Sequence, residues 1–86
     1  MGDAPTFDVG LGRKDYGRRL FMLRFRRLRL SQAAFADRFG LSFGMVRDVE
    51  QGRVKPSKAL RVLVELIEHD PAMVAAAASR TRTETL

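Results

Sequence analysis

The chain contains no cysteine and only one histidine among its 86 residues. The lack of cysteine excludes disulfides and thiolate metal ligands, and His69 has no second strong ligand near it in the sequence, so we expect neither a metal ion nor another cofactor. No apolar run approaches the roughly 20 residues of a membrane span. The opening segment MGDAPTFDVG contains acidic residues and no apolar core, which is not the pattern of a signal peptide. These absences predict a cytoplasmic protein without a membrane partner.

Sequence signatures of catalysis are also missing. The chain has no glycine-rich phosphate loop, and its carboxylates are spread singly along the sequence instead of forming a pair suited to acid–base chemistry. We therefore do not expect an enzyme.

Positive charge is concentrated in one part of the chain. The net charge is +6 and the sequence pI is about 11.1. Residues 13–29 carry eight basic residues against one acidic residue, whereas the rest of the chain is close to neutral. The basic residues of this block are Arg13, Lys14, Arg18, Arg19, Arg24, Arg26, Arg27 and Arg29. Such a block indicates a polyanionic partner, with a simple solvated helix face as the alternative.

Apolar residues recur with helical spacing, and no segment alternates with the period of a β-strand, so the predicted fold is all-α. Five helices are expected, over residues 15–28, 32–39, 43–51, 56–69 and, more weakly, 74–78. In the first helix the predicted apolar face consists of Leu20, Phe21, Leu23, Phe25 and Leu28. Residues 1–14 are predicted to be a flexible, basic-ended arm, residues 15–78 a single DNA-binding domain, and residues 79–86 a disordered tail.

Two of these helices are separated by a short turn that contains Gly40, and this spacing is typical of a helix-turn-helix. Ser31 and Ser42 are suitable N-caps for the two helices. Apolar positions predicted to face the core of the unit are Phe35, Phe39, Leu41, Val46 and Val49. Phe43, Gly44, Arg47, Asp48 and Gln51 fall on the opposite side of the second helix, which in such a unit enters the DNA major groove.

The segment LSQAAFADRFGLSFGMVRDVEQGRVKPS, residues 30–57, resembles the helix-turn-helix of Xre/Cro-type repressors. The matching positions are Leu30, Ser31, Gln32, Phe35, Ala36, Phe39, Gly40, Leu41, Ser42, Val46, Glu50, Gly52 and Pro56. The continuation ALRVLVELIEHDPAMV resembles the final helices of HigA-like and MqsA-like antitoxins. Two positions depart from the family pattern: Val49 stands where an aromatic residue or leucine is common, and Arg29 where a glycine often ends the first helix.

The resemblance implies a five-helix, lambda-repressor-like bundle. It also implies a sequence-specific regulator of transcription that binds double-stranded DNA as a dimeric repressor and associates with the nucleoid. An alternative is an antitoxin that neutralises a small ribonuclease-type toxin and autoregulates its operon; a phage-borne repressor fits equally well. RNA binding is less favoured, because the common sequence-reading RNA modules use a sheet.

The family pattern assigns roles to individual residues. Phosphate contacts are expected from Ser31, Gln32, Ser42, Gln51, Arg53, Lys55 and Lys58. Arg47 is expected to read guanine, or alternatively to pair with Asp48 or Asp37. Phe43 and Gly44 would contact a thymine methyl and allow close approach of the helix, or Phe43 would fold back onto Arg38 or Phe39. Asp48 would accept from a cytosine N4, repel non-cognate phosphates or anchor Arg47.

Three further groups of residues have expected roles. Glu50 is expected to pair with Arg24 or Arg26 of the first helix. Arg13, Lys14, Arg18 and Arg19 are expected either to enter a minor groove or to attract phosphates generally. Residues expected in the core, or at a twofold dimer contact, are Leu60, Leu63, Val64, Ile67 and Met73.

Overall fold

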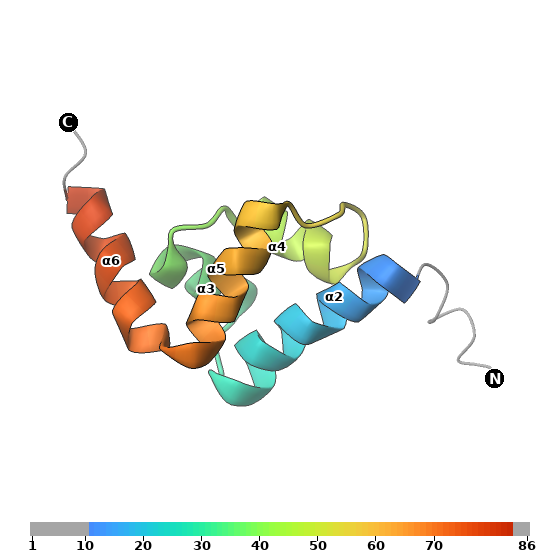
Figure 1. The fold of residues 1–86 in the computed structure, drawn as a ribbon, viewed down its shortest axis with the longest axis horizontal. Helices are drawn as coiled ribbons and strands as arrows, with labels where there is room; N and C mark the ends of the chain where they lie inside the picture. Colours follow the sequence, from blue (N-terminus) through green and yellow to red (C-terminus); the bar gives the residue numbers. More distant parts are fainter. Residues whose placement is uncertain (1–10, 84–86) are drawn as a thin grey trace.

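The computed structural model describes residues 11–83, with side chains from Tyr16 to Arg82. Within this range the chain is helical, and none of it lies in a strand, which confirms the predicted all-α class for the described residues (Figure 1). The elements in order are α2 (Leu11–Phe21), the π-helical continuation η1 (Met22–Arg27), α3 (Gln32–Phe39), α4 (Phe43–Glu50), α5 (Lys58–His69) and α6 (Pro71–Thr83). Among these helices, none combines the length and the apolar character that a membrane span requires.

Serine caps set the starts of the three middle helices. The hydroxyls of Ser31, Ser42 and Ser57 each accept a hydrogen bond from the backbone N–H three residues later, at distances of 3.0 to 3.1 Å. Each such cap contributes about 1 kcal/mol. At the other end of α3, Gly40 adopts a left-handed conformation with φ of 74°. The predicted starts of α3 and α4 are therefore confirmed, and only three residues separate these helices.

The two ends of the described chain are more helical than expected. α2 begins at Leu11, so residues 11–14 of the predicted flexible arm lie in a helix. α6 begins at Pro71, a favourable first helical residue, and continues to Thr83, so residues 79–83 of the predicted disordered tail are helical as well. The reason is tertiary: Arg82 Nη2 donates to the carbonyl oxygen of Asp37, which ties α6 to α3. The remainder of the arm and tail, residues 1–10 and 84–86, lies outside the described residues.

The first helix widens into a π-helix, and this changes which side chains face the core. Leu20 and Leu23 are buried as predicted, and Leu28 is half-buried. Phe21 and Phe25, however, are exposed and stack on each other with ring centroids 5.2 Å apart, so their assignment to the apolar core face was wrong. A π-helix places more residues in each turn than an α-helix, so side chains after Phe21 rotate away from the positions that α-helical spacing predicts.

The helix ends at an unusual residue. Arg29 has a φ of 60°, the one positive value among the non-glycine residues that the structure describes. This is the position where the family pattern often has glycine, and a left-handed conformation costs a residue with a Cβ about 1–2 kcal/mol. The departure seen in the sequence therefore leaves the backbone turn in place, with strain at Arg29.

The core lies between α2, α3, α4 and α5 and is closed at one end by α6. Its buried apolar residues are Leu20, Leu23, Phe35, Ala36, Phe39, Val46, Val49, Leu60, Val64, Ile67 and Val74. The side chains of Leu60, Val64 and Ile67 are buried in this core, so they are not available as dimer contacts in the folded chain. Leu63 is half-buried against the same core, whereas Met73 is exposed.

Candidate nucleic-acid interface

An aromatic ring and a guanidinium stack on the outer face of α4. Phe43, the first residue of the helix, is 46% exposed, and the guanidinium carbon of Arg47 lies 5.5 Å from its ring centroid. Arg47 Nε also donates to Asp48 Oδ1 at 3.1 Å, and Arg53 Nη1 lies 3.9 Å from the same oxygen. Asp48 thus lies between two arginines in the unbound chain, in agreement with the expected alternative in which it anchors Arg47. Phe43 keeps almost half of its surface in solvent.

Gly44 has no role in the packing of its own chain. A Cβ added at this position would find Arg47 Nη2 at 3.6 Å as its nearest neighbour, which is an ordinary van der Waals contact. Alanine would therefore fit, and it is favoured over glycine in a helix by about 1 kcal/mol. The packing of the chain therefore does not require glycine at this position, and contact with an external molecule is a reason for glycine that the fold does not supply.

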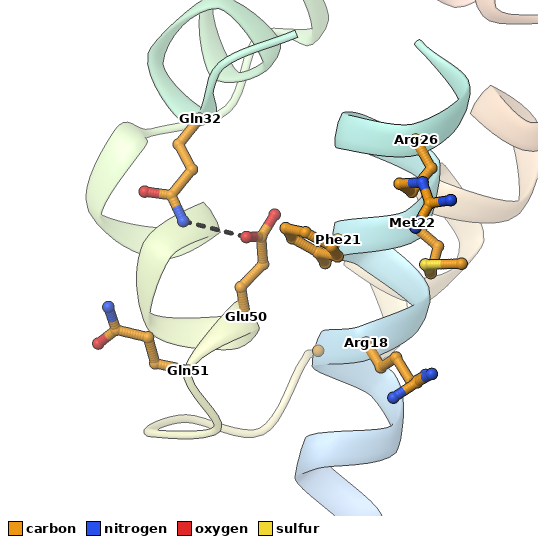
Figure 2. Close-up of a pocket in the computed structure, with 8 residues that line it drawn as sticks. Arg18, Phe21, Met22, Arg26, Gln32, Glu50 and Gln51 are labelled. Atoms are coloured by element: carbon orange, nitrogen blue, oxygen red, sulfur yellow. Dashed lines mark hydrogen bonds between the residues drawn. The ribbon is translucent and has the colours of Figure 1, made fainter. Parts of the chain in front are cut away.

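The beginning of α3 is linked to the end of α4 through Glu50. Arg24 donates to the two carboxylate oxygens of Glu50 from Nε and Nη2, at 2.7 and 2.9 Å, and from Nη1 to the carbonyl of Leu30 at 2.8 Å. Of the two arginines considered from the sequence, Arg24 is the partner of Glu50. Gln32 Nε2 donates to Glu50 Oε1 at 3.0 Å (Figure 2). Gln32 is therefore positioned at the first turn of α3 by an internal hydrogen bond.

The expected phosphate-binding residues flank these helices and are mostly open to solvent. Ser31 and Ser42 are exposed but serve as caps, and Gln32 is half-buried. The exposed residues that follow α4 and begin α5 are Gln51, Arg53, Lys55 and Lys58. These positive and polar side chains lie within one short stretch of chain after the outer face of α4.

The expected basic arm is divided by the structure. Arg18 is exposed on α2, whereas Arg19 turns towards α5, where its Nε and Nη2 donate to the carboxylate of Glu68 at 2.9 and 2.6 Å. This hydrogen-bonded pair lowers the pKa of Glu68. Arg19 is thus engaged within the fold, which does not fit its expected role in the arm. The side chains of Arg13 and Lys14 lie outside the described residues.

A hollow of about 550 Å³ separates the first helix from the ends of α3 and α4 (Figure 2). In Figure 2, Arg18, Met22 and Arg26 follow one another along the first helix, and Gln32, Glu50 and Gln51 lie across the gap. From the sequence, Arg26 was considered as a member of the basic block and as a partner of Glu50, but not as part of this hollow. Its spacing of four and eight residues from Met22 and Arg18 places the three on one helical face.

Gly17 also lines this hollow, and it was not singled out from the sequence. A Cβ at Gly17 would lie 2.6 Å from the carbonyl oxygen of Glu50 and 2.7 Å from that of Val49. Those distances are too short for a carbon–oxygen contact, so only glycine allows α2 to approach the end of α4 this closely. The signal in the sequence was a glycine inside a helical pattern, which marks a close approach in many helices.

The candidate interface was compared with two other sources of information, namely possible metal ligands and similar proteins. Among the described residues, no three side chains of the metal-binding types come together. Comparisons of the chain with known protein families, with curated proteins and with solved structures found no match.

Proposed function

We propose that the chain is a sequence-specific regulator of transcription that binds double-stranded DNA, with α3 and α4 acting as the helix-turn-helix of a lambda-repressor-like bundle. The observation that supports this best is the outer face of α4. There Phe43 is exposed, the packing of the chain does not require glycine at position 44, and the guanidinium of Arg47 lies over the ring of Phe43. Contact with DNA would remove the apolar surface of Phe43 from water, and the absence of a side chain at Gly44 would allow the helix to approach the DNA closely.

In this proposal α4 lies in the major groove and its first turns reach the base edges. Arg47 exchanges its single hydrogen bond to Asp48 for two to guanine O6 and N7. Phe43 contacts a thymine methyl, and Gly44 lets the helix backbone approach. Asp48 remains paired with Arg53 or accepts from a cytosine amino group.

Phosphate contacts would fix the orientation of α4. The first turns of α3 and α4 present backbone N–H groups, with Ser31, Gln32 and Ser42 beside them. Gln51, Arg53, Lys55 and Lys58 would hold the backbone on the other side. Release of counterions by these cations and by the net charge of +6 would supply most of the sequence-independent affinity.

The regulator we propose is a homodimer that reads two half-sites. Because Leu60, Val64 and Ile67 are internal, the contact would use the outer side of α5 and the start of α6. The exposed apolar residues there are Val62, Leu66 and Met73. Glu65 and Arg61 flank them, so a twofold contact can pair opposite charges.

A second candidate function is that of an antitoxin which binds a small ribonuclease-type toxin and represses its own operon. The observation that favours it is the amount of exposed apolar surface, which includes Phe25 and Val62 on separate helices and exceeds what one DNA face uses. Growth rescue on co-expression with the product of the adjacent reading frame would distinguish this function from simple repression.

The decisive experiment measures binding of the purified protein to the DNA upstream of its own coding sequence and to a scrambled duplex of equal length, at physiological salt. We expect a preference of roughly a thousandfold or more for the upstream duplex, as for specific regulators. Equal affinity for both duplexes, weak and strongly salt-dependent, would contradict sequence-specific regulation.

A further inference from the structure

An apolar ridge projects from the first helix at the point where it becomes π-helical. It consists of Phe21, Met22 and Phe25, which are 37%, 40% and 51% exposed. The rings of Phe21 and Phe25 stack, and the guanidinium of Arg24 lies over both of them, 5.3 and 5.8 Å from the two ring centroids. The two rings are therefore held in a fixed arrangement, although solvent covers their outer side, and Met22 lies next to Phe21 on the side of the helix that carries Arg18 and Arg26 (Figure 2). We call these three residues the η1 ridge.

The surroundings of the η1 ridge are hollow and positively charged. Hollows of about 550, 710 and 470 Å³ adjoin it, and Arg26 lines all three. Arg18, Arg26 and Arg29 form no ion pair with any side chain that the structure describes. The two carboxylates that line these hollows are already neutralised, Glu50 by Arg24 and Glu68 by Arg19. Among the side chains that the structure describes, no carboxylate therefore pairs with these three arginines, and a ligand at the ridge would meet their positive charge.

Charge decides what kind of molecule suits this surface. A second copy of the chain would bring Arg18, Arg26 and Arg29 against the same residues of its partner, and like charges across an interface are costly. The phosphates of DNA would neutralise the arginines, but a hydrated backbone would leave Met22 and Phe25 without an apolar partner. A protein segment that combines carboxylates with apolar side chains complements both features.

We propose that the η1 ridge is the docking site for an acidic, amphipathic segment of another protein. The apolar side chains of that segment would enter the hollows on either side of Phe21, and its carboxylates would pair with Arg18, Arg26 and Arg29. Helix-in-groove recognition of this kind needs apolar anchors about one turn apart, which the spacing of the ridge and its hollows allows.

Docking at the η1 ridge would also regulate the proposed DNA binding. Phe21 and Met22 line the same hollow as Gln32 and Gln51, which we assign to phosphate contacts. A bound segment there would cover these two residues and exclude the DNA backbone. This second part of the inference rests on the proposed function, whereas docking itself does not.

The test uses a synthetic helical peptide with Glu and Asp on one face and Leu and Phe on the other. Its binding to the full-length, ¹⁵N-labelled chain would be followed by amide chemical shifts and by fluorescence anisotropy. Comparison peptides keep the acids but replace Leu and Phe by Ser, or keep Leu and Phe but replace the acids by Lys. The protein variants are Met22→Ala combined with Phe25→Ala and, as a control at an exposed apolar residue outside both the ridge and the proposed dimer contact, Val54→Ala.

We expect the acidic amphipathic peptide to shift the amides of η1 and of Gln32, and to bind roughly tenfold less tightly to the ridge variant than to the native chain or the control variant. Upstream duplex DNA should displace it. Equal binding of the serine-containing peptide, unchanged affinity of the ridge variant, or shifts confined to other helices would overturn the inference. So would a loss of DNA affinity in the ridge variant equal to its loss of peptide affinity, because the ridge would then be part of the DNA interface.

The same titrations separate this inference from the proposed function. Peptide binding at the ridge without any preference for upstream DNA would leave docking intact and remove the regulator. Specific DNA binding without peptide binding would leave the regulator intact and remove docking.

Discussion

Arg24 and Glu50 form a two-bond ion pair although their side chains are only 7% and 6% exposed. The pair joins the first helix to the last residue of α4, and Gln32 extends it to the first residue of α3. Three elements of the candidate interface are thus fixed relative to one another by one buried carboxylate.

Removing that carboxylate should strongly destabilise the fold. Glu50→Ala leaves the Arg24 guanidinium buried without its counter-charge, and we expect a loss of about 3–5 kcal/mol in the free energy of unfolding, measured by urea denaturation. The control is Glu68→Ala at the exposed Arg19 pair, which should lose at most about 1 kcal/mol. Similar losses in the two variants would show that burial does not determine how much the Arg24–Glu50 pair contributes to the free energy of unfolding.

Gly17 and Gly44, which both lie inside helices, should respond to alanine in opposite directions. Gly17→Ala forces a Cβ against the carbonyls of Val49 and Glu50, and we expect a loss of about 1–3 kcal/mol in unfolding free energy. Gly44→Ala meets no obstacle and should gain about 1 kcal/mol from helix propensity. If Gly44 faces DNA, the same variant should bind the upstream duplex more weakly. Thermal melts and binding isotherms of the two variants test this pattern, and stabilisation of Gly44→Ala with unchanged DNA affinity would remove Gly44 from the interface.

Arg29→Gly should stabilise the chain. Glycine adopts a φ of 60° without the steric cost that a Cβ brings, although part of the gain is offset because glycine is more flexible in the unfolded state. We expect a net increase of about 0.5–1 kcal/mol in unfolding free energy. Arg29→Ala serves as the control, since it removes the same charge but keeps the Cβ. Equal stability of the two variants would mean that charge, not backbone strain, dominates at this position.

Arg47→Ala should reduce discrimination between DNA sequences more than overall affinity for DNA. Loss of a bidentate contact with guanine costs about 1–3 kcal/mol for the cognate duplex only. Competition binding with cognate and scrambled duplexes measures the difference. Arg53→Ala, which removes a charge from the same Asp48 anchor, should weaken both duplexes and lower the salt dependence by about one unit of slope. If Arg47→Ala lowered the affinity for the cognate and the scrambled duplex equally, Arg47 would be a phosphate contact and not a reader of guanine.

Acid should weaken the contact between α2 and α5. Hydrogen bonding to Arg19 lowers the pKa of Glu68 below its ordinary value of 4.5. The unfolded chain therefore binds the proton more readily than the folded one, so the stabilisation is complete above pH 4.5 and is lost as the pH falls through the folded value. Unfolding free energies of the native chain and Glu68→Gln should converge at low pH and differ near neutrality. A constant difference across this range would show that the pair does not titrate as proposed.

Local features of the sequence predicted most of the helical framework. Ser31, Ser42 and Gly40 define the ends of α3 and α4 because capping and left-handed turns depend on residues only a few positions apart. The apolar periodicity of α5 likewise predicted Leu60, Val64 and Ile67 as residues of the core or of a dimer contact. In the structure all three are buried in the core. The assignment of DNA-contacting residues rests on the same local pattern and stays a prediction.

Contacts between distant segments decided what the sequence did not. The length of α6 depends on Arg82 reaching Asp37, the fate of Arg19 on Glu68, and the need for Gly17 on the carbonyl of Glu50. The π-helical turn changes the direction of the side chains after Phe21, and Phe25 lies in solvent, where it stacks on Phe21 at the end of α2. The sequence alone therefore determined where α3 and α4 begin and where charge accumulates. Only the tertiary structure decided which arginines pair with distant carboxylates, as Arg19 and Arg24 do, and which of the described aromatic residues face solvent, because those outcomes depend on partners that lie far apart in the chain.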